Sequence, residues 1–455
     1  MGSLVVLAAV RRRWCGGGIP ARKVGLVSQS VQPILLNGSW VASRSAGTFQ
    51  AVNPTLERPM PQVFPVSSWS EIDSVIGAAA AASREMRGWP GSRFADFLEA
   101  YALEIESRAD LLVETAHAET GLAKSPRLKD GELPRTTNQI RQAAAAARSE
   151  SWRVPTIDTA TNIRSMFGQL GPVVVFGPNN FPYAYNGIAG GDFAAAIAAG
   201  NPVIAKGHPC HPETTRIFGE ATVAAVRSTG MPAGLVQLIY RTSHEDGLRL
   251  VSDSRIGGIG YTGARHTGLR LKAAADAAGK PIYLELSSIN PVFMLPGALQ
   301  ERLEKIADEF AASCLMGAGQ FCTNPGLVIV PSGALGEALT AAVAARFSAA
   351  ASGTMLAEGV RSSFLKAVQT IQAAGAELVT GGQAGGGEAP EHEPQRRGHE
   401  AEVRGSHPGT GGGRRQGADR ERDEWQHDHG ARHHAVGGHL DRKSTRLNSV
   451  TSLSR

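Results

Sequence analysis

Between residues 173 and 286 the chain alternates between short apolar runs and longer stretches with helical periodicity. The runs 173–176 and 202–205 contain no alternating polar positions, which is typical of strands buried on both faces. The stretch 214–229 instead places apolar side chains every three or four residues, as an amphipathic helix does. Strand and helix in regular succession predict an α/β fold with a parallel sheet covered on both faces.

The flanking regions extend this pattern. The Asn37-Gly38 pair within the run 34–41 predicts a β-hairpin. Helical periodicity then covers 70–87, 92–122 and 131–149, followed by an irregular segment at 152–162. The remaining elements expected are strands at 236–240, 258–261, 281–286, 291–295 and 327–330 and helices at 244–252, 265–278, 299–316 and 364–374, the last of which leads to the stretch 377–382.

The composition changes near the C-terminus. From residue 383 onward there is no Ile, Phe, Tyr, Met or Cys, and 8 of the 13 histidines fall there. Such a segment cannot bury enough apolar surface to offset its conformational entropy. We expect residues 384–455 to be disordered, either as a natural tail with metal-binding histidines or, in the interpretation we favour, as a non-native sequence after loss of the coding frame. Residues 1–30 are expected to be a disordered extension.

The positive charge is concentrated at the N-terminus. The chain carries 46 Lys and Arg against 41 Asp and Glu, and residues 1–56 hold six of the basic side chains and none of the acidic ones. The rest is close to neutral, so nothing favours nucleic-acid binding. The low-charge run 187–205 contains Asp192 and Pro202 and predicts no membrane span. The basic leader is either a mitochondrial presequence or, in the interpretation we favour, the translation from a mis-chosen upstream start codon. We expect a cytoplasmic protein, or a mitochondrial matrix protein if the leader is a presequence.

The cysteines give the first candidate chemistry. They are scattered and lack Cys-x-x-Cys spacing, so we expect a reducing compartment and no metal site. Cys322 lies in the stretch Gly-Ala-Gly-Gln-Phe-Cys-Thr-Asn-Pro at 317–325, where glycines bring the backbone close to the thiol. A thiolate is a nucleophile when polar donors, a base or a helix N-terminus support it. On this peptide alone, a buried structural thiol is an equally good interpretation.

Three other segments carry polar groups at the ends of predicted strands. Asn180 follows the strand 173–176, and its amide can donate to an oxygen that gains negative charge. Glu285 ends the strand 281–286 and can act as a general base for water. The stretch 261–268 forms a strand, a glycine turn and a helix start, whose amides can hold a pyrophosphate. Each segment by itself also fits an ordinary turn or a paired surface acid.

Taken in chain order, these segments resemble the NAD(P)-dependent aldehyde dehydrogenase superfamily. The motifs are Asn180-Phe181-Pro182, Lys206, Thr262-Gly263, Glu285 and Gly-Gln-Phe-Cys-Thr at 319–323. The stretches 190–196, 206–209 and 287–293 are most similar to members that oxidise 2-oxoglutarate semialdehyde (2,5-dioxopentanoate). The resemblance covers 31–383 and implies a Rossmann-type cofactor domain at 31–284, with a bridging segment near 150–165, and a partial α/β catalytic domain at 285–383.

The resemblance implies a mechanism. Cys322 attacks the aldehyde, and the oxyanion lies between the Asn180 amide and the Cys322 backbone N–H. A hydride then passes to the nicotinamide, and Glu285 activates the water that hydrolyses the thioester. A cysteine hydrolase would need a histidine base instead, and no histidine before the tail lies in a recognisable partner motif.

The cofactor is expected to be NADP or NAD. Lys206 matches the family's cofactor lysine. NAD-preferring members often carry a glutamate three residues later, where this chain has Pro209; without that carboxylate a 2′-phosphate meets no repulsion, so NADP is accommodated at least as well as NAD. The other cofactor positions that the resemblance implies are Pro178, Thr262, Gly263 and Gly268.

The substrate is expected to be a small aldehyde. Arg135 lies on a helix that the resemblance places beside the substrate tunnel, where a guanidinium can bind the distal carboxylate of an oxo-acid aldehyde. A solvated helix arginine is an equally good interpretation. Phe181 and Tyr185 are expected to be tunnel walls.

The family's later segments are not found in this chain. These are a Glu-Glu-x-Phe-Gly-Pro segment, the last catalytic-domain strands and the C-terminal strand of the subunit interface. The family homo-oligomerises, but this interface strand is expected to be absent. The alternative to an active dehydrogenase is therefore a truncated, catalytically impaired member that retains only cofactor binding or a non-catalytic role.

Overall fold

The computed structural model describes residues 4–8, 30–382 and 449–451. The other residues of the predicted N-terminal extension and of the predicted C-terminal tail lie outside the described residues. Residues 4–8 and 449–451 are strands, and disorder in the rest of both segments stays a prediction.

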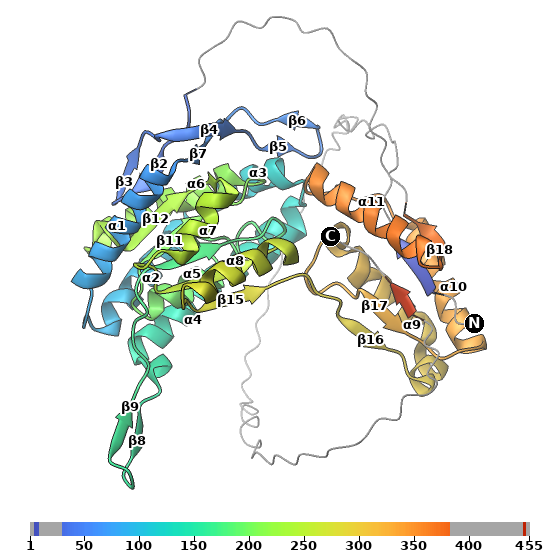
Figure 1. Cartoon of the computed structure of the whole chain (residues 1–455). Helices are drawn as coiled ribbons and strands as arrows, with labels where there is room; N and C mark the ends of the chain where they lie inside the picture. Colours follow the sequence, from blue (N-terminus) through green and yellow to red (C-terminus); the bar gives the residue numbers. More distant parts are fainter. Residues whose placement is uncertain (1–3, 9–29, 383–448, 452–455) are drawn as a thin grey trace, which may run out of the picture. The chain divides into compact units, whose positions relative to one another are not determined.

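A seven-stranded sheet forms the centre of the region before residue 286 (Figure 1). Its parallel strands are β10 (Val173–Phe176), β11 (Val203–Lys206), β12 (Val236–Ile239), β14 (Gly258–Thr262) and β15 (Ile282–Glu285). The strand order is β15-β14-β10-β11-β12-β2-β3. The chain therefore turns to the other side of β10 between β12 and β14, and ligands of open α/β sheets bind at the carboxyl ends of the strands at such a point.

The edge of this sheet is the hairpin expected at 34–41. Strands β2 (Ile34–Leu36) and β3 (Ser39–Val41) pair antiparallel, and β2 also pairs with β12. Asn37 and Gly38 have φ values of 48° and 73°, which a tight hairpin turn requires. The prediction is confirmed in both strands and the turn.

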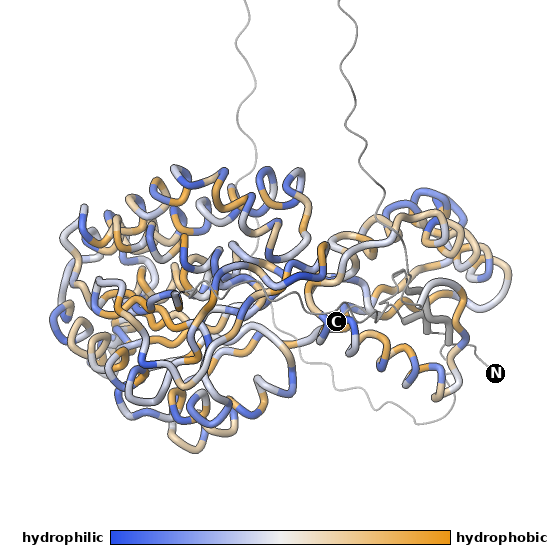
Figure 2. Tube along the Cα trace, turned by 90° about the horizontal axis from the view of Figure 1, so that it is seen from above, coloured by the Kyte–Doolittle hydropathy of each residue, from blue (hydrophilic) through white to orange (hydrophobic). Residues whose placement is uncertain are grey.

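Helices cover the sheet where the periodicity predicts them. The connecting helices are α5 (Gly191–Ala198), α6 (Pro212–Thr229), α7 (His244–Ser252) and α8 (Arg265–Ala277). On one side α7 contacts α8, and Arg249 of α7 stacks over Trp69 of α1 (Trp69–Glu85) at 3.7 Å. On the other side α2 (Gly91–Glu106) contacts α5, α6 and α4 (Leu133–Ser149). Figure 2 shows hydrophilic and hydrophobic residues alternating along the helices, as amphipathic elements covering a sheet require.

Short strands and helical turns complete this region. The three-stranded sheet consists of β4 (Ser45–Phe49), β7 (Phe64–Ser67) and β13 (Arg241–Thr242), and β5 (Val52–Asn53) pairs with β6 (Arg58–Pro59). Helix α3 (Ala109–Thr120) is followed by a helical segment η1 (Lys124–Glu132), and single turns η2 (Ser151–Arg153) and η3 (Ala233–Leu235) lie in loops.

The bridging segment near 150–165 is an antiparallel hairpin, and the prediction of an irregular segment at 152–162 is wrong in part. Strands β8 (Thr156–Asp158) and β9 (Ile163–Ser165) pair only with each other among the described strands. Both strands are exposed at every position. Because neither strand has a buried face, the sequence shows no alternating pattern of apolar and polar residues from which the two strands could be predicted.

A second sheet follows β15, with strand order β16-β17-β19-β1-β18. Its strands are β16 (Pro291–Phe293), β17 (Leu327–Ile329), β19 (Ser449–Thr451), β1 (Leu4–Ala8) and β18 (Ala376–Gly381). Helices α9 (Pro296–Leu315), α10 (Ala334–Ala349) and α11 (Glu358–Ala373) belong to the same region, and the turn η4 (Met316–Gly319) follows α9. Helix α10 was not predicted, because its alanines lie all around the helix and define no apolar stripe.

This region has a small hydrophobic core of its own. Phe310, Cys314, Val328, Val343 and Phe347 are buried together. No helix in the described parts of the chain combines the length and apolarity that a membrane span needs.

Candidate active site

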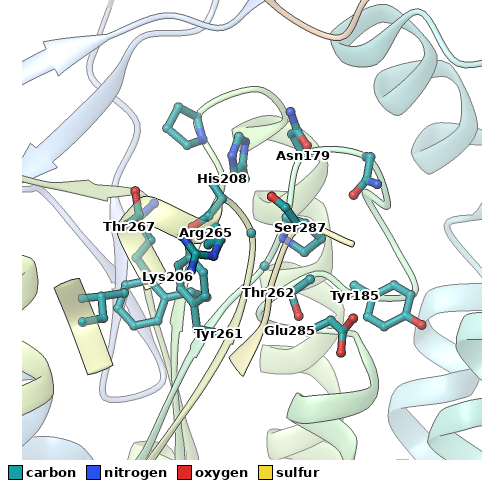
Figure 3. Close-up of a pocket in the computed structure, with 18 of the residues that line it drawn as sticks. Asn179, Tyr185, Lys206, His208, Tyr261, Thr262, Arg265, Thr267, Glu285 and Ser287 are labelled. Carbon is teal, nitrogen blue, oxygen red and sulfur yellow. Dashed lines mark hydrogen bonds between the residues drawn. The ribbon is translucent and has the colours of Figure 1, made fainter. Parts of the chain in front are cut away.

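A cavity of about 1160 Å³ opens at the carboxyl ends of β10, β11, β14 and β15. This exceeds the roughly 300–1,000 Å³ typical of a site for one small ligand, so it has room for a cofactor and a substrate. The predicted site residues that line it are Pro178, Asn180, Phe181, Tyr185, Lys206, Thr262, Gly263, Glu285 and Cys322. Thr262 and Glu285 are paired at the ends of β14 and β15, and in the view of Figure 3 they are drawn, with Tyr185, to the right of Lys206 and Thr267.

A left-handed turn leads into the thiol. Gly317, Ala318 and Gly319 have φ values of 59°, 56° and 75°, a conformation that glycine adopts readily and alanine only at a cost of about 1 kcal/mol or more. Gly317 and Gly319 are thus needed to turn the chain from α9 toward the cavity.

Polar side chains just after β15 hold the backbone of Cys322. Asn290 Nδ2 donates to the carbonyl oxygen of Cys322 at 2.7 Å and to that of Asn324 at 2.9 Å. The Ser288 hydroxyl donates to the same Cys322 oxygen. These bonds connect the loop that carries Cys322 to the strand end that carries Glu285.

Asn180 lies against the same loop. Its side chain is buried, with 8% of the residue exposed, and Nδ2 donates to the carbonyl oxygen of Gln320 at 2.7 Å. A side-chain amide has two N–H groups, so the second is left for another acceptor. Gln320 is itself fixed, because its Oε1 accepts from the Leu356 N–H at 2.9 Å and its Nε2 donates to the Thr354 carbonyl at 3.1 Å.

Aromatic rings form the neighbouring wall. Phe181 and Tyr185 meet edge to face, with ring centroids 5.1 Å apart, and both line the cavity. Arg135 is not among the lining residues, but its Nη2 donates to the Tyr185 hydroxyl at 2.9 Å and its guanidinium lies 5.2 Å from that ring. Arg135 therefore contacts a residue that lines the cavity without lining it itself.

The N-terminus of α8 faces the cavity, because residues 262–267 all line it. The cap residue Ala264 has no side-chain acceptor for the free N–H groups of the first turn. Those amides and the positive end of the helix dipole fit a pyrophosphate. Gly263 is held by a bond from its N–H to the Glu285 carbonyl at 3.0 Å.

Gly268, which the resemblance assigned to the cofactor, does not line the cavity. It lies inside α8, and a Cβ there would come within 2.4 Å of a methyl carbon of Leu286 and 3.0 Å of the Tyr261 ring. The absence of a side chain at this position lets the helix pack closely on the strand.

A second positive group lies at the Lys206 end. Arg241 lines the cavity with Lys206, and burial, with a smaller effect of the Arg241 charge, lowers the pKa of Lys206 to about 8. Burial also lowers the pKa of His208, and that of His211 to about 4, so both imidazoles are neutral at pH 7. The sequence did not single out Arg241, since nothing local to β13 shows that this side chain lines the same cavity as Lys206.

Asp192, on the first turn of α5, is another lining residue that sequence reasoning missed. Burial raises its pKa, and the charge of Glu285 raises it further. Within the described residues, no group of three or more His, Cys, Asp and Glu side chains could hold a metal ion. The uncapped amides of α8 and the side chains of Lys206 and Arg241 fit the phosphates of a dinucleotide, as in a nucleotide-dependent enzyme.

A doubly wound sheet with this cavity at its switch point is the arrangement of Rossmann-type dinucleotide-binding proteins. Residues 40–394 match the Aldehyde dehydrogenase family, and the chain belongs to that family, whose enzymes oxidise aldehydes to carboxylic acids with NAD(P).

Two curated relatives are similar over most of the chain. The alpha-ketoglutaric semialdehyde dehydrogenase 2 of Azospirillum brasilense is 38% identical over 381 residues, which cover 81% of this chain and 71% of the relative. The alpha-ketoglutaric semialdehyde dehydrogenase of Acinetobacter baylyi is 34% identical, covering 77% of this chain and 68% of the relative.

Solved structures share the fold. A variant of aldehyde dehydrogenase C from Pseudomonas syringae, in complex with NAD⁺ and octanal, has a TM-score of 0.69 at 22% identity, covering 80% of this chain and 73% of its own. An aldehyde dehydrogenase from Bacillus cereus in complex with NAD⁺ has a TM-score of 0.67 at 20% identity, covering 77% and 72%.

Proposed function

We propose that this chain oxidises 2-oxoglutarate semialdehyde to 2-oxoglutarate, with Cys322 as the nucleophile. The observation that carries the proposal is the meeting of Cys322, Asn180 and Glu285 in one cavity with an anion-binding helix end. The two curated relatives support the substrate, because both are named for this semialdehyde.

The first half-reaction uses the thiol and the amide. The thiol proton of Cys322 passes to solvent, the sulfur adds to the aldehyde carbon with formation of a C–S bond, and the carbonyl electron pair moves to the oxygen. The free N–H of Asn180 and the Cys322 backbone N–H stabilise that oxyanion. When bound, the nicotinamide accepts the hydride that leaves the same carbon. Collapse of the oxyanion leaves an acyl group on Cys322 as a thioester.

The second half-reaction uses the carboxylate. Glu285 takes a proton from water, whose oxygen bonds to the acyl carbon while the C–S bond breaks. The electron pair returns to the Cys322 sulfur and the carboxylic acid is released. Glu285 lies at the end of β15, close in sequence to Ser288 and Asn290. These two side chains hold the backbone of the loop that carries Cys322.

We further propose that NADP binds at least as well as NAD. The cation pair Lys206 and Arg241 lines the cavity where Pro209 replaces the carboxylate of NAD-preferring members. Two positive charges at this end of the cavity favour the extra phosphate.

The test is an assay of the purified chain with 2-oxoglutarate semialdehyde, following NADPH or NADH formation. We expect turnover by the native chain and by Cys314→Ala, and loss of at least about a thousandfold for Cys322→Ala. Cys314 is the matched control because it lies in α9 and is buried in the hydrophobic core of that region. Cofactor binding without turnover of any aldehyde would support the alternative, a catalytically impaired member.

We also infer that the chain is a cytoplasmic homo-oligomer. The free cysteines Cys210, Cys314 and Cys322 suit a reducing compartment, and the mitochondrial alternative gains no support from the named bacterial relatives. Exposed apolar side chains on the β8–β9 hairpin, including Ile157 and Ile163 at 65% and 60% exposure, suit a subunit contact.

A further inference from the structure

Arg127 is a buried cation between the segment that carries Asn180 and the loop that carries Cys322. It lies in η1, and 14% of its side chain is exposed. Its Nη1 pairs with Glu132 Oε2 at 2.5 Å, and its Nη2 donates to the main-chain carbonyl of Asn180 at 3.1 Å. One guanidinium group thus contacts the backbone of the residue whose amide faces the thiol loop.

The same guanidinium stacks on two aromatic rings. Its central carbon lies 4.5 Å from the ring centroid of Phe181 and 4.8 Å from that of Phe321, and the two centroids are 5.1 Å apart. Phe181 follows Asn180 directly, and Phe321 precedes Cys322. Arginine stacks on aromatic faces and donates in a fixed plane, so Arg127 contacts both segments from one position.

Glu132 completes the cluster from the end of η1, directly before α4. Its side chain is fully buried, and its Oε1 accepts from the N–H groups of Tyr183 and Ala184 at 2.9 and 3.0 Å. The turn after Phe181 is therefore fixed to the same ion pair. Replacing Arg127 by a neutral residue would leave the buried Glu132 carboxylate without its cation, which is strongly destabilising.

We propose that Arg127 is a positioning residue that sets Asn180 and the Cys322 loop at the distance the oxyanion site requires. This inference rests on the proposed roles of Cys322 and Asn180. Arg127 does not line the cavity, so it acts through the Asn180 carbonyl and the two rings and not on the substrate. A displacement of about 1 Å at such a site can cost on the order of a hundredfold in rate, so a loosened cluster should lower kcat.

The test is Arg127→Lys. The ammonium keeps the charge beside Glu132, but it cannot lie flat on two rings while also donating to Asn180. We expect kcat to fall about 10- to 100-fold for both 2-oxoglutarate semialdehyde and a neutral aldehyde, with KM and the Kd for NADP within about twofold. Hydrogen exchange should rise in peptides spanning 178–186 and 317–326 and nowhere else.

Arg148→Lys is the matched control, because Arg148 lies on the exposed surface of α4 and pairs with Asp96. This substitution should change neither kcat nor hydrogen exchange. If Arg127→Lys fails to fold, Phe321→Leu removes one face of the stack and leaves the ion pair, and exchange should rise in 317–326 alone.

Three results would overturn the inference: unchanged exchange in the two peptides, a general rise in exchange across the chain, or a kcat within about threefold of the native value. If the native chain oxidises no aldehyde, the proposed function fails separately, and the exchange comparison still decides whether Arg127 holds the two segments.

Discussion

Two cysteines eight residues apart show how strongly position in the fold decides the chemistry of one residue type. Cys314, near the end of α9, is 3% exposed and packs in an apolar core, where a thiol behaves as a small hydrophobic group. Cys322 lines the cavity and has its carbonyl held by Ser288 and Asn290. The left-handed turn at 317–319 between them changes the direction of the chain.

Arg135 is the residue proposed to select an acidic aldehyde. Arg135→Ala should raise KM for 2-oxoglutarate semialdehyde about tenfold or more, because a charge-assisted bond to the distal carboxylate is lost. KM for a neutral aldehyde of similar length should stay the same, as measured by steady-state kinetics. Arg148→Ala is the control. Equal changes in KM for both aldehydes would show that Arg135 only supports Tyr185.

Lys206 should make NADP binding depend on pH. With a pKa of about 8, its ammonium is charged at pH 7 and largely neutral at pH 9. The attraction for the 2′-phosphate is therefore present below the pKa and lost above it. We expect the Kd for NADP, measured by direct titration, to rise about tenfold between pH 7 and pH 9.

The Kd for NAD, which lacks that phosphate, should rise less over the same range. Lys206→Arg stays charged and should remove most of the pH dependence. Parallel pH profiles for NADP and NAD would argue against contact between Lys206 and the phosphate.

Among the elements, the start of α8 is a place where one substitution should stabilise the protein and weaken cofactor binding. Ala264 leaves the first-turn amides uncapped at the cavity. Ala264→Asp supplies a cap, which should stabilise the protein by about 1 kcal/mol. The introduced carboxylate accepts hydrogen bonds from the first-turn amides, so they no longer donate to a pyrophosphate, and its negative charge repels that group. The Kd for either cofactor should rise more than about tenfold while Tm stays level or increases.

Ala264→Ser is the matched variant, because a hydroxyl caps the helix without adding charge. It should keep cofactor affinity within a few-fold of the native chain. Thermal unfolding and cofactor titration measure the two effects. Unchanged affinity in Ala264→Asp would mean that the pyrophosphate does not lie at α8.

At the scale of the whole molecule, the β8–β9 hairpin is the candidate contact between subunits. Ile157→Asp together with Ile163→Asp should dissociate the oligomer, since two charges would replace exposed apolar side chains in the contact. Sedimentation velocity measures the change in mass. Thr159→Asp, on the turn of the same hairpin, is the control. A native chain that sediments as a monomer would contradict the proposed oligomer.

The sequence by itself determined the elements of the central sheet and the order of the motifs. Continuous apolar runs predicted β10 and β11, and Asn37-Gly38 predicted the first hairpin, because backbone geometry within a few residues sets these patterns. The resemblance placed Asn180, Glu285 and Cys322 in one reaction, and all three line the cavity.

Only the tertiary structure decided which distant side chains meet. Arg127 reaches the backbone of Asn180, Arg241 joins Lys206, and Gly268 packs against Leu286 away from the cavity. These contacts depend on the strand order β15-β14-β10-β11 and on packing between elements far apart in sequence. Local periodicity carries no information about such contacts, because it reports which face of an element is buried and not what covers that face.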